Sequence, residues 1–180
     1  RLVSSAASDV YKRQNINLGK KLITDKKILI EKERLKEISE TEYHEILINH
    51  TTPYSPFDIL ENKSLLLENN FDNLNAIDWD KGCYVGQEIT ARMKYRGLLK
   101  KKLYALKIKS GDVLEGDELI VNNKKIGTIV SKANSNIFAA LNINFVNEIK
   151  NKDQNLVIND SLSFDFLNWK FFSVKTYWNY

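Results

Sequence analysis

Short β-rich runs separated by turn residues make up the second half of the sequence, and this pattern limits the chain to few architectures. The gaps between the runs contain Gly, Asn, Asp or Ser, which favour turns. Asn122-Asn123 predicts a tight hairpin, because Asn tolerates positive φ. We therefore expect a small antiparallel β-barrel or sandwich over residues 99–180. The runs are Leu103–Ile108, Glu118–Val121, Lys125–Ser131, Ile137–Phe145, Leu156–Ile158 and Leu162–Phe172.

The part before residue 99 predicts helix and turns. Between Glu33 and His50 apolar residues recur every three to five positions, which indicates an amphipathic helix. Pro53 and Pro56 end that pattern, and residues 57–80 are rich in the turn formers Asn and Asp. The predicted fold class is α+β, with a partial α+β domain over residues 15–98, a boundary near Gly97–Leu99 and a β-barrel after it.

Composition excludes several classes of protein. The chain is 43% hydrophobic and 28% charged, which is ordinary for a folded globular protein. Its single cysteine excludes a disulfide framework, and also a zinc or iron–sulfur site built from this chain's thiols alone. No apolar run approaches the ~20 residues of a membrane-spanning helix. We expect a protein of a reducing compartment that does not bind membranes.

Residues 1–14 differ from the rest of the chain. They are rich in Ser, Ala and Arg, whereas the remainder is rich in Asn, Lys and Ile. They lack the apolar core of a secretory signal and the amphipathic face of a transit peptide. We interpret them as foreign sequence, with a frayed native terminus as the alternative, and expect the chain to be the C-terminal part of a longer protein.

The segment from Asp78 to Arg92, called here the motif segment, contains the cysteine, Cys83, and two of the seven glycines. Gly82–Gly86 predicts a loop that leads into a helix beginning at Gln87. The positive end of a helix dipole and a nearby lysine both favour a thiolate. A lone cysteine is nevertheless more often a small buried hydrophobic residue. The residues alone leave a reactive and a buried thiol both open.

Residues 81–88, Lys-Gly-Cys-Tyr-Val-Gly-Gln-Glu, resemble the signature of the YgfZ family, as do Thr90-Ala91-Arg92 and Tyr95-Arg96-Gly97 after them. Members of this family are folate-binding proteins of iron–sulfur cluster assembly and repair, related in fold to the glycine-cleavage T-protein, an aminomethyltransferase. The stretch Leu67-Glu68-Asn69-Asn70 resembles the family sequence that precedes the signature. Asn17-Leu18-Gly19 resembles the end of a family segment that lies still earlier in the sequence. The family's N-terminal half, which supplies most of the folate cleft, has no counterpart here.

The resemblance implies roles for individual residues. It makes Cys83 the functional thiol, in a loop shaped by Lys81, Gly82, Tyr84, Gly86, Gln87 and Glu88. It places Glu68 against the pterin ring of tetrahydrofolate, where a carboxylate accepts two parallel N–H donors. Arg92 and Arg96 would either bind the folate carboxylates or pair with Glu88 or Asp80.

The resemblance also implies partners and a location. The partners are folate and iron–sulfur client or assembly proteins, and tRNA modification is an associated process. The location is the bacterial cytoplasm or, for a eukaryotic protein, the mitochondrial matrix. The resemblance favours a non-enzymatic assembly factor over an enzyme. The alternative within the same fold is a folate-dependent aminomethyltransferase, which needs no cysteine at this position.

A strip of basic residues supports a third hypothesis, a β-barrel that binds nucleic acid. Against it, Tyr104, Phe138 and Phe145 are spaced like core residues and not like a stacking face. His44 and His50 have no second ligand at metal spacing, so we expect no histidine-based metal site. The strip comprises Arg92, Lys94, Arg96, Lys100, Lys101, Lys102, Lys107 and Lys109.

Overall fold

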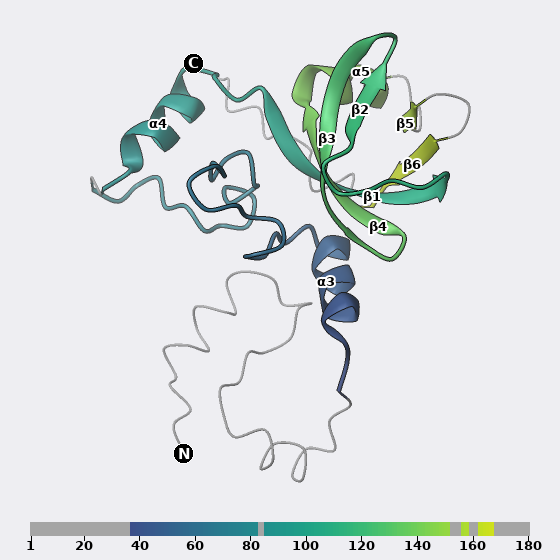
Figure 1. The fold of residues 1–180 in the computed structure, drawn as a ribbon. Helices are drawn as coiled ribbons and strands as arrows, with labels where there is room; N and C mark the ends of the chain where they lie inside the picture. The colour runs from purple at the N-terminus through teal and green to yellow at the C-terminus, as the bar shows by residue number, and fades with distance from the viewer. Residues whose placement is uncertain (1–36, 83–84, 152–155, 159–161, 168–180) are drawn as a thin grey trace.

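A six-stranded antiparallel sheet is the main feature of the computed structural model, which describes residues 37–82, 85–151, 156–158 and 162–167 (Figure 1). The strand order is β2-β3-β4-β1-β6-β5. The edge strands β2 and β5 also contact each other, so the sheet forms a nearly closed barrel. The strands are β1 (Lys101–Ser110), β2 (Glu118–Val121), β3 (Lys124–Ala133), β4 (Asn136–Asn142), β5 (Leu156–Ile158) and β6 (Leu162–Phe166).

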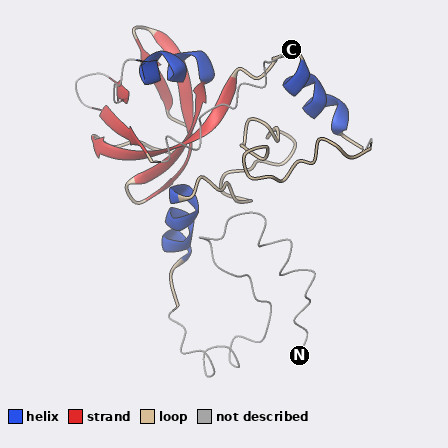
Figure 2. Cartoon of the chain, turned by 180° about the vertical axis from the view of Figure 1, so that it is seen from behind, coloured by secondary structure: helices blue, strands red, loops and turns tan. Residues whose placement is uncertain are grey.

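Three helices accompany the sheet in the described residues: α3 (Glu40–Asn49), α4 (Gln87–Tyr95) and α5 (Ile143–Asn151). Figure 1 shows α3 beneath the barrel and α5 at its top, whereas α4 stands apart from it. The view from behind in Figure 2 shows the same separation of α4. None of these helices has the length and apolar character needed to cross a bilayer.

The barrel interior forms the larger of two apolar clusters. Tyr104 and Leu106 of β1 point into it, and Val146 and Ile149 of α5 close one end. Burial raises the pKa of the Tyr104 hydroxyl above its ordinary value. Tyr104 and Phe138 are buried and Phe145 packs partly buried against the core, which confirms that these aromatics belong to the core.

Helix α3 covers the outer surface of the barrel and creates a second cluster. Ile48 of α3 packs there with Leu103 and Ala105 of β1, Ala133 of β3 and Phe138 of β4. Residues 103–106 are therefore buried on both faces of the sheet. Such a strand carries a continuous apolar run, because neither face meets water.

The start of α3 is defined by a capping box. The backbone N–H of Glu42 donates to Ser39 Oγ (3.1 Å), and the N–H of Ser39 donates to Glu42 Oε2 (2.8 Å). These bonds satisfy donors that a helix terminus leaves free, and they hold the pKa of Glu42 below its ordinary value. The predicted helix over Glu33–His50 is confirmed over Glu40–Asn49. Residues 37–39 precede the helix, with Ser39 as its N-cap, and residues 33–36 lie outside the described residues.

A buried carboxylate joins α3 and the turn after it to the barrel. Asp58 accepts hydrogen bonds from the Tyr54 N–H (2.8 Å) and from the Ser131 hydroxyl of β3, and its Oδ1 lies 3.0 Å from His44 Nε2 of α3. His44 also stacks on Phe57, with ring centroids 4.8 Å apart. Asp58 is 2% exposed, so this network is shielded from water.

The predicted strands agree with the structure except at the ends of two runs. Of the run Leu162–Phe172, β6 spans Leu162–Phe166 and Leu167 lies in a turn, while residues 168–172 lie outside the described residues. Asn122 and Asn123 have φ values of 49° and 60°, which confirms the tight hairpin between β2 and β3. The run Ile137–Phe145 was predicted as a strand throughout, but β4 ends at Asn142 and α5 begins at Ile143. The Asn142 carboxamide oxygen accepts from the N–H groups of Asn144 (2.9 Å) and Phe145 (3.4 Å), which favours a helix start.

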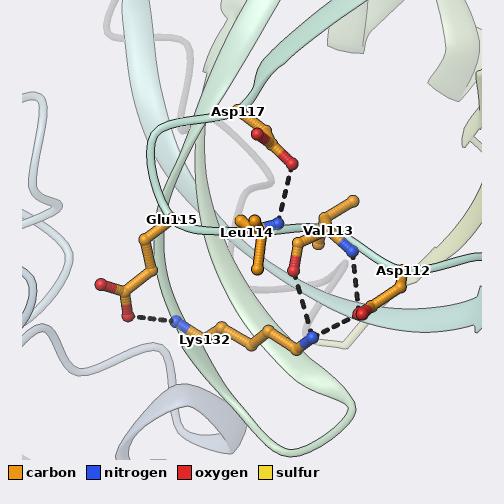
Figure 3. Close-up of polar contacts among 6 residues, drawn as sticks. All are labelled: Asp112, Val113, Leu114, Glu115, Asp117 and Lys132. Carbon is orange, nitrogen blue, oxygen red and sulfur yellow. Dashed lines mark hydrogen bonds and ion pairs between the residues drawn. The ribbon is translucent and has the colours of Figure 1, made fainter.

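The connection between β1 and β2 is organised around Lys132 of β3 (Figure 3). The Lys132 ammonium donates to Asp112 and to the Val113 carbonyl (3.1 Å), and the Lys132 N–H donates to Glu115 Oε1 (3.1 Å). The hydrogen bond from Lys132 holds the pKa of Asp112 below its ordinary value. Asp112 is therefore paired with a cation, whereas Glu115 and Asp117 accept from the backbone N–H groups of Lys132 and Leu114.

Candidate functional site

The residues on either side of the motif cysteine lie at the surface. Cys83 and Tyr84 are outside the described residues, so the roles predicted for them stay predictions. Lys81 and Gly82 before them are exposed, and Val85 after them is fully exposed. A Cβ added to Gly82 or Gly86 would meet nothing within 4 Å. The motif is thus flanked by residues that face solvent.

Helix α4 begins directly after this loop, as the sequence predicted. Gly86 occupies the N-cap position with φ +86°, a left-handed conformation that glycine adopts without the steric cost of a Cβ. Glu88 lies in the first turn, and its carboxylate forms an i,i+4 ion pair with Arg92. Of the two roles open for Arg92, the structure thus contains the pairing with Glu88. Arg96, at the helix end, is exposed.

An aromatic and cationic cluster joins Trp79, near the start of the motif segment, to the last turn of α4. The Lys94 Nζ atom lies 3.7 Å from the ring centroid of Trp79, and the Trp79 and Tyr95 rings meet edge-on at 6.3 Å. Burial lowers the pKa of Lys94, and the charges of Asp80 and Asp72 act against that shift. The sequence analysis missed this cluster; the signal was an aromatic residue on each side of the motif.

Glu68 lies in a stretch that is attached to the start of β1. Its side chain is 19% exposed, and Oε2 lies 3.4 Å from Lys101 Nζ. The Glu68 carbonyl accepts from the Leu103 N–H (2.8 Å), and Asn70 Nδ2 donates to the Leu103 carbonyl (2.6 Å). Asp72 pairs with Lys102 (3.1 Å). The carboxylate predicted to face a pterin is therefore partly buried and engaged by a lysine.

Asp72 pairs with Lys102 of β1, and its charge, together with that of Asp80, opposes the lowering of the Lys94 pKa by burial.

Much of the basic strip is compensated by acidic partners. Lys101 pairs with Glu68, Lys102 with Asp72 and Arg92 with Glu88. Lys109 pairs with Asp165 of β6 at 2.6 Å. Affinity for nucleic acid depends on cations that neutralise phosphates, so these pairs give the nucleic-acid hypothesis little support.

The described residues contain no group of three or more His, Cys, Asp or Glu side chains arranged to hold a metal ion. His44 pairs with the Asp58 carboxylate.

This chain is similar to known proteins over part of its length. No family model matches it. It is 33% identical over 110 residues to a protein of Dictyostelium discoideum named iron–sulfur cluster assembly factor IBA57 homolog, mitochondrial, covering 58% of this chain and 27% of that protein. It is 32% identical over 117 residues to the Saccharomyces cerevisiae protein named IBA57, covering 64% and 22%.

A bacterial relative matches as well. An uncharacterized protein of Haemophilus influenzae is 36% identical over 92 residues, covering 48% of this chain and 33% of that protein. In all three cases the matching part is a third or less of the relative's length.

Proposed function

We propose that this chain is part of an iron–sulfur cluster assembly factor of the YgfZ type, acting through Cys83. The observation that carries the proposal is the Lys-Gly-Cys-Tyr-Val-Gly-Gln-Glu motif, in which the exposed residues Lys81, Gly82 and Val85 flank the pair Cys83-Tyr84 and the last two residues begin α4. Relatives that are named iron–sulfur cluster assembly factors support it. Because those relatives are also named mitochondrial, the mitochondrial matrix is the proposed location for a eukaryotic source, and the cytoplasm for a bacterial one.

The chemistry proposed for Cys83 follows from its being a single thiol. One thiolate cannot hold an iron–sulfur cluster that needs four ligands, so its role is to share a cluster with ligands of a partner or to act in redox chemistry. A following helix N-terminus and the nearby Lys81 favour the thiolate, which is the form that binds iron. The protein's part is therefore to present a thiolate at a surface loop.

The first prediction tests this role. In the 180-residue chain Cys83 should react with iodoacetamide at neutral pH faster than a cysteine in a short peptide, because the local charges favour the thiolate. In the complete reading frame, Cys83→Ala should fold normally yet fail to restore iron–sulfur enzyme activity in cells that lack the factor. Val85→Ala, a change at a fully exposed neighbour, is the matched control and should restore activity.

A structural role of Cys83 in the core would give the opposite result. If Cys83 resists alkylation until the chain unfolds, and Cys83→Ala restores activity while the protein loses about 1–3 kcal/mol of stability, the thiol is a core residue. The function would then have to depend on other residues.

We propose tetrahydrofolate as the ligand of the complete protein, with Glu68 as the carboxylate that faces the pterin and Arg96 free to contact the folate tail. Support comes from the resemblance and from the partial burial of Glu68, which would strengthen a charge-assisted hydrogen bond. The Lys101 ammonium is 3.4 Å from this carboxylate and itself largely exposed, so a ligand would displace a weak contact.

The second prediction follows from that assignment. Glu68→Gln should weaken tetrahydrofolate binding by the complete protein by about 1.5–3 kcal/mol, measured by calorimetric titration. Asp165→Asn, which removes a carboxylate paired with Lys109 on the barrel, should leave the affinity unchanged. The 180-residue chain should bind poorly because it lacks half of the cleft. Tight binding by this chain, or an unchanged affinity in Glu68→Gln, would mean that the site lies elsewhere.

A further inference from the structure

Asn70 connects the stretch that carries Glu68 to the first strand of the barrel. Its side chain is fully buried, and its Nδ2 atom donates to the Leu103 carbonyl of β1 at 2.6 Å. We propose that Asn70 is a positioning residue, which holds the Glu68 carboxylate where it meets the pterin. Because it concerns the ligand contact of Glu68, this inference rests on the proposed function.

Residues 68–70 bond to β1 beyond the part of that strand which β6 covers. β6 pairs with β1 over Leu106–Ser110. At Leu103, which is 2% exposed, the backbone groups bond to the stretch instead: the N–H donates to the Glu68 carbonyl (2.8 Å), and the carbonyl accepts from Asn70. Buried backbone groups need partners within the protein. The Asn70 carboxamide therefore supplies the donor that a neighbouring strand supplies elsewhere in the sheet.

Two features of Asn70 are energetically unfavourable. Its φ is 63°, in the left-handed region that residues other than glycine seldom occupy. Its Oδ1 atom is buried and has no hydrogen-bond partner among the described residues. Unfavourable features of this kind persist where the surrounding structure enforces them, and they are concentrated at functional sites. At Asn70 both features accompany the bond that ties the Glu68 stretch to the barrel.

The bonds at Leu103 fix the backbone from which the Glu68 side chain extends. The other contact given for that side chain is with Lys101, whose ammonium lies 3.4 Å from Oε2 and is largely exposed. An exposed partner of this kind contributes little to holding the carboxylate. The buried bonds of the Glu68 carbonyl and of Asn70 are therefore the stronger constraint. A carboxylate that is already in place binds a ligand without the cost of being ordered first.

The test uses Asn70→Gly, which removes the carboxamide and leaves a residue that adopts positive φ without steric cost. In the complete protein this change should weaken tetrahydrofolate binding by about threefold to tenfold in calorimetric titration, the range of one hydrogen bond. In a Glu68→Gln background it should weaken binding by less than about twofold, because two residues that act through one contact are not additive.

Asn75→Gly is the matched control. Asn75 lies in the same stretch and also has positive φ, 54°, but it is exposed. The control should leave the affinity unchanged in both backgrounds.

A second measurement needs no ligand. In the 180-residue chain, Asn70→Gly should speed amide hydrogen exchange at Leu103 by about threefold to tenfold, because the Leu103 N–H is bonded to the stretch that Asn70 holds. Asn75→Gly should not change that rate. An unchanged rate in Asn70→Gly would overturn the proposal, since Asn70 would then not hold the stretch on β1.

The titrations have two further outcomes that overturn the proposal. An unchanged affinity in Asn70→Gly, or an equal loss in both backgrounds, would mean that Asn70 does not act through Glu68. A failure of the proposed function looks different: Glu68→Gln would then bind tetrahydrofolate as tightly as the parent protein. That result would overturn the pterin contact, and with it the inference that depends on it.

Discussion

Replacing Asp58 with alanine should lower the free energy of unfolding by about 3–5 kcal/mol. The carboxylate is 2% exposed and accepts from the Tyr54 N–H and the Ser131 hydroxyl, with His44 Nε2 at 3.0 Å. Its removal leaves all three groups without their acceptor in a site that water does not reach. An unsatisfied buried polar group costs far more than a surface hydrogen bond contributes. Equilibrium unfolding in urea measures the difference.

The matched control for this change is Asp165→Ala. Asp165 pairs with Lys109 at 2.6 Å, but both side chains are at least a third exposed. Exposed ion pairs typically contribute about 0–1 kcal/mol to stability. The free energy of unfolding of Asp165→Ala should therefore stay close to that of the parent protein. If Asp58→Ala lowers the free energy of unfolding no more than Asp165→Ala does, α3 and the turn at Asp58 are held to the barrel by apolar packing alone.

Replacing Gly127 with alanine should lower the free energy of unfolding by about 2–3 kcal/mol, the cost of overpacking a core. Gly127 of β3 lies opposite Leu141 of β4. A Cβ at this position would stand 2.5 Å from the Ala140 carbonyl oxygen and 2.5 Å from Leu141 Cδ2. The carbonyl belongs to the neighbouring strand's backbone, so relief of the clash requires that β3 and β4 separate locally.

Gly82→Ala is the control for the glycine, because a Cβ at Gly82 meets nothing within 4 Å. A surface substitution of this kind should change the free energy of unfolding by no more than about 0.5 kcal/mol. Thermal unfolding followed by circular dichroism separates the two variants. Equal stability of Gly127→Ala and the parent would mean that β3 and β4 can separate at little cost.

Local backbone preference explains why so much of the secondary structure was predictable. Asn122 and Asn123 tolerate positive φ, so the hairpin between β2 and β3 could be located from two residues. Gly86 before a run of helix formers likewise located the start of α4. The end of β4 was mispredicted because Ile143 and Phe145 suit a strand as well as a helix. The cap at Asn142, together with Val146 and Ile149 facing the core, decides for a helix.

The candidate site was predictable in part. The motif around Cys83 and the stretch at Glu68 were recognisable as patterns of consecutive residues, and the pairing of Arg92 with Glu88 follows from their i,i+4 spacing. The lysine partner of Glu68 was not predictable, since Lys101 is one of three consecutive lysines and only the docking of two distant segments selects it.

Most strands, turns and helix starts could be predicted because they depend on residues within a few positions of one another; α5 is the exception. The contacts between distant side chains depend on the fold, as for Asp58 with Ser131, 73 positions away, and for Trp79 with Lys94 across the motif. These contacts arise when the barrel and its loops pack, and their strength comes from the exclusion of water at that moment. A pattern along the chain carries no signal for a contact such as that of Asp58 with Ser131, whose partners are related only by the fold.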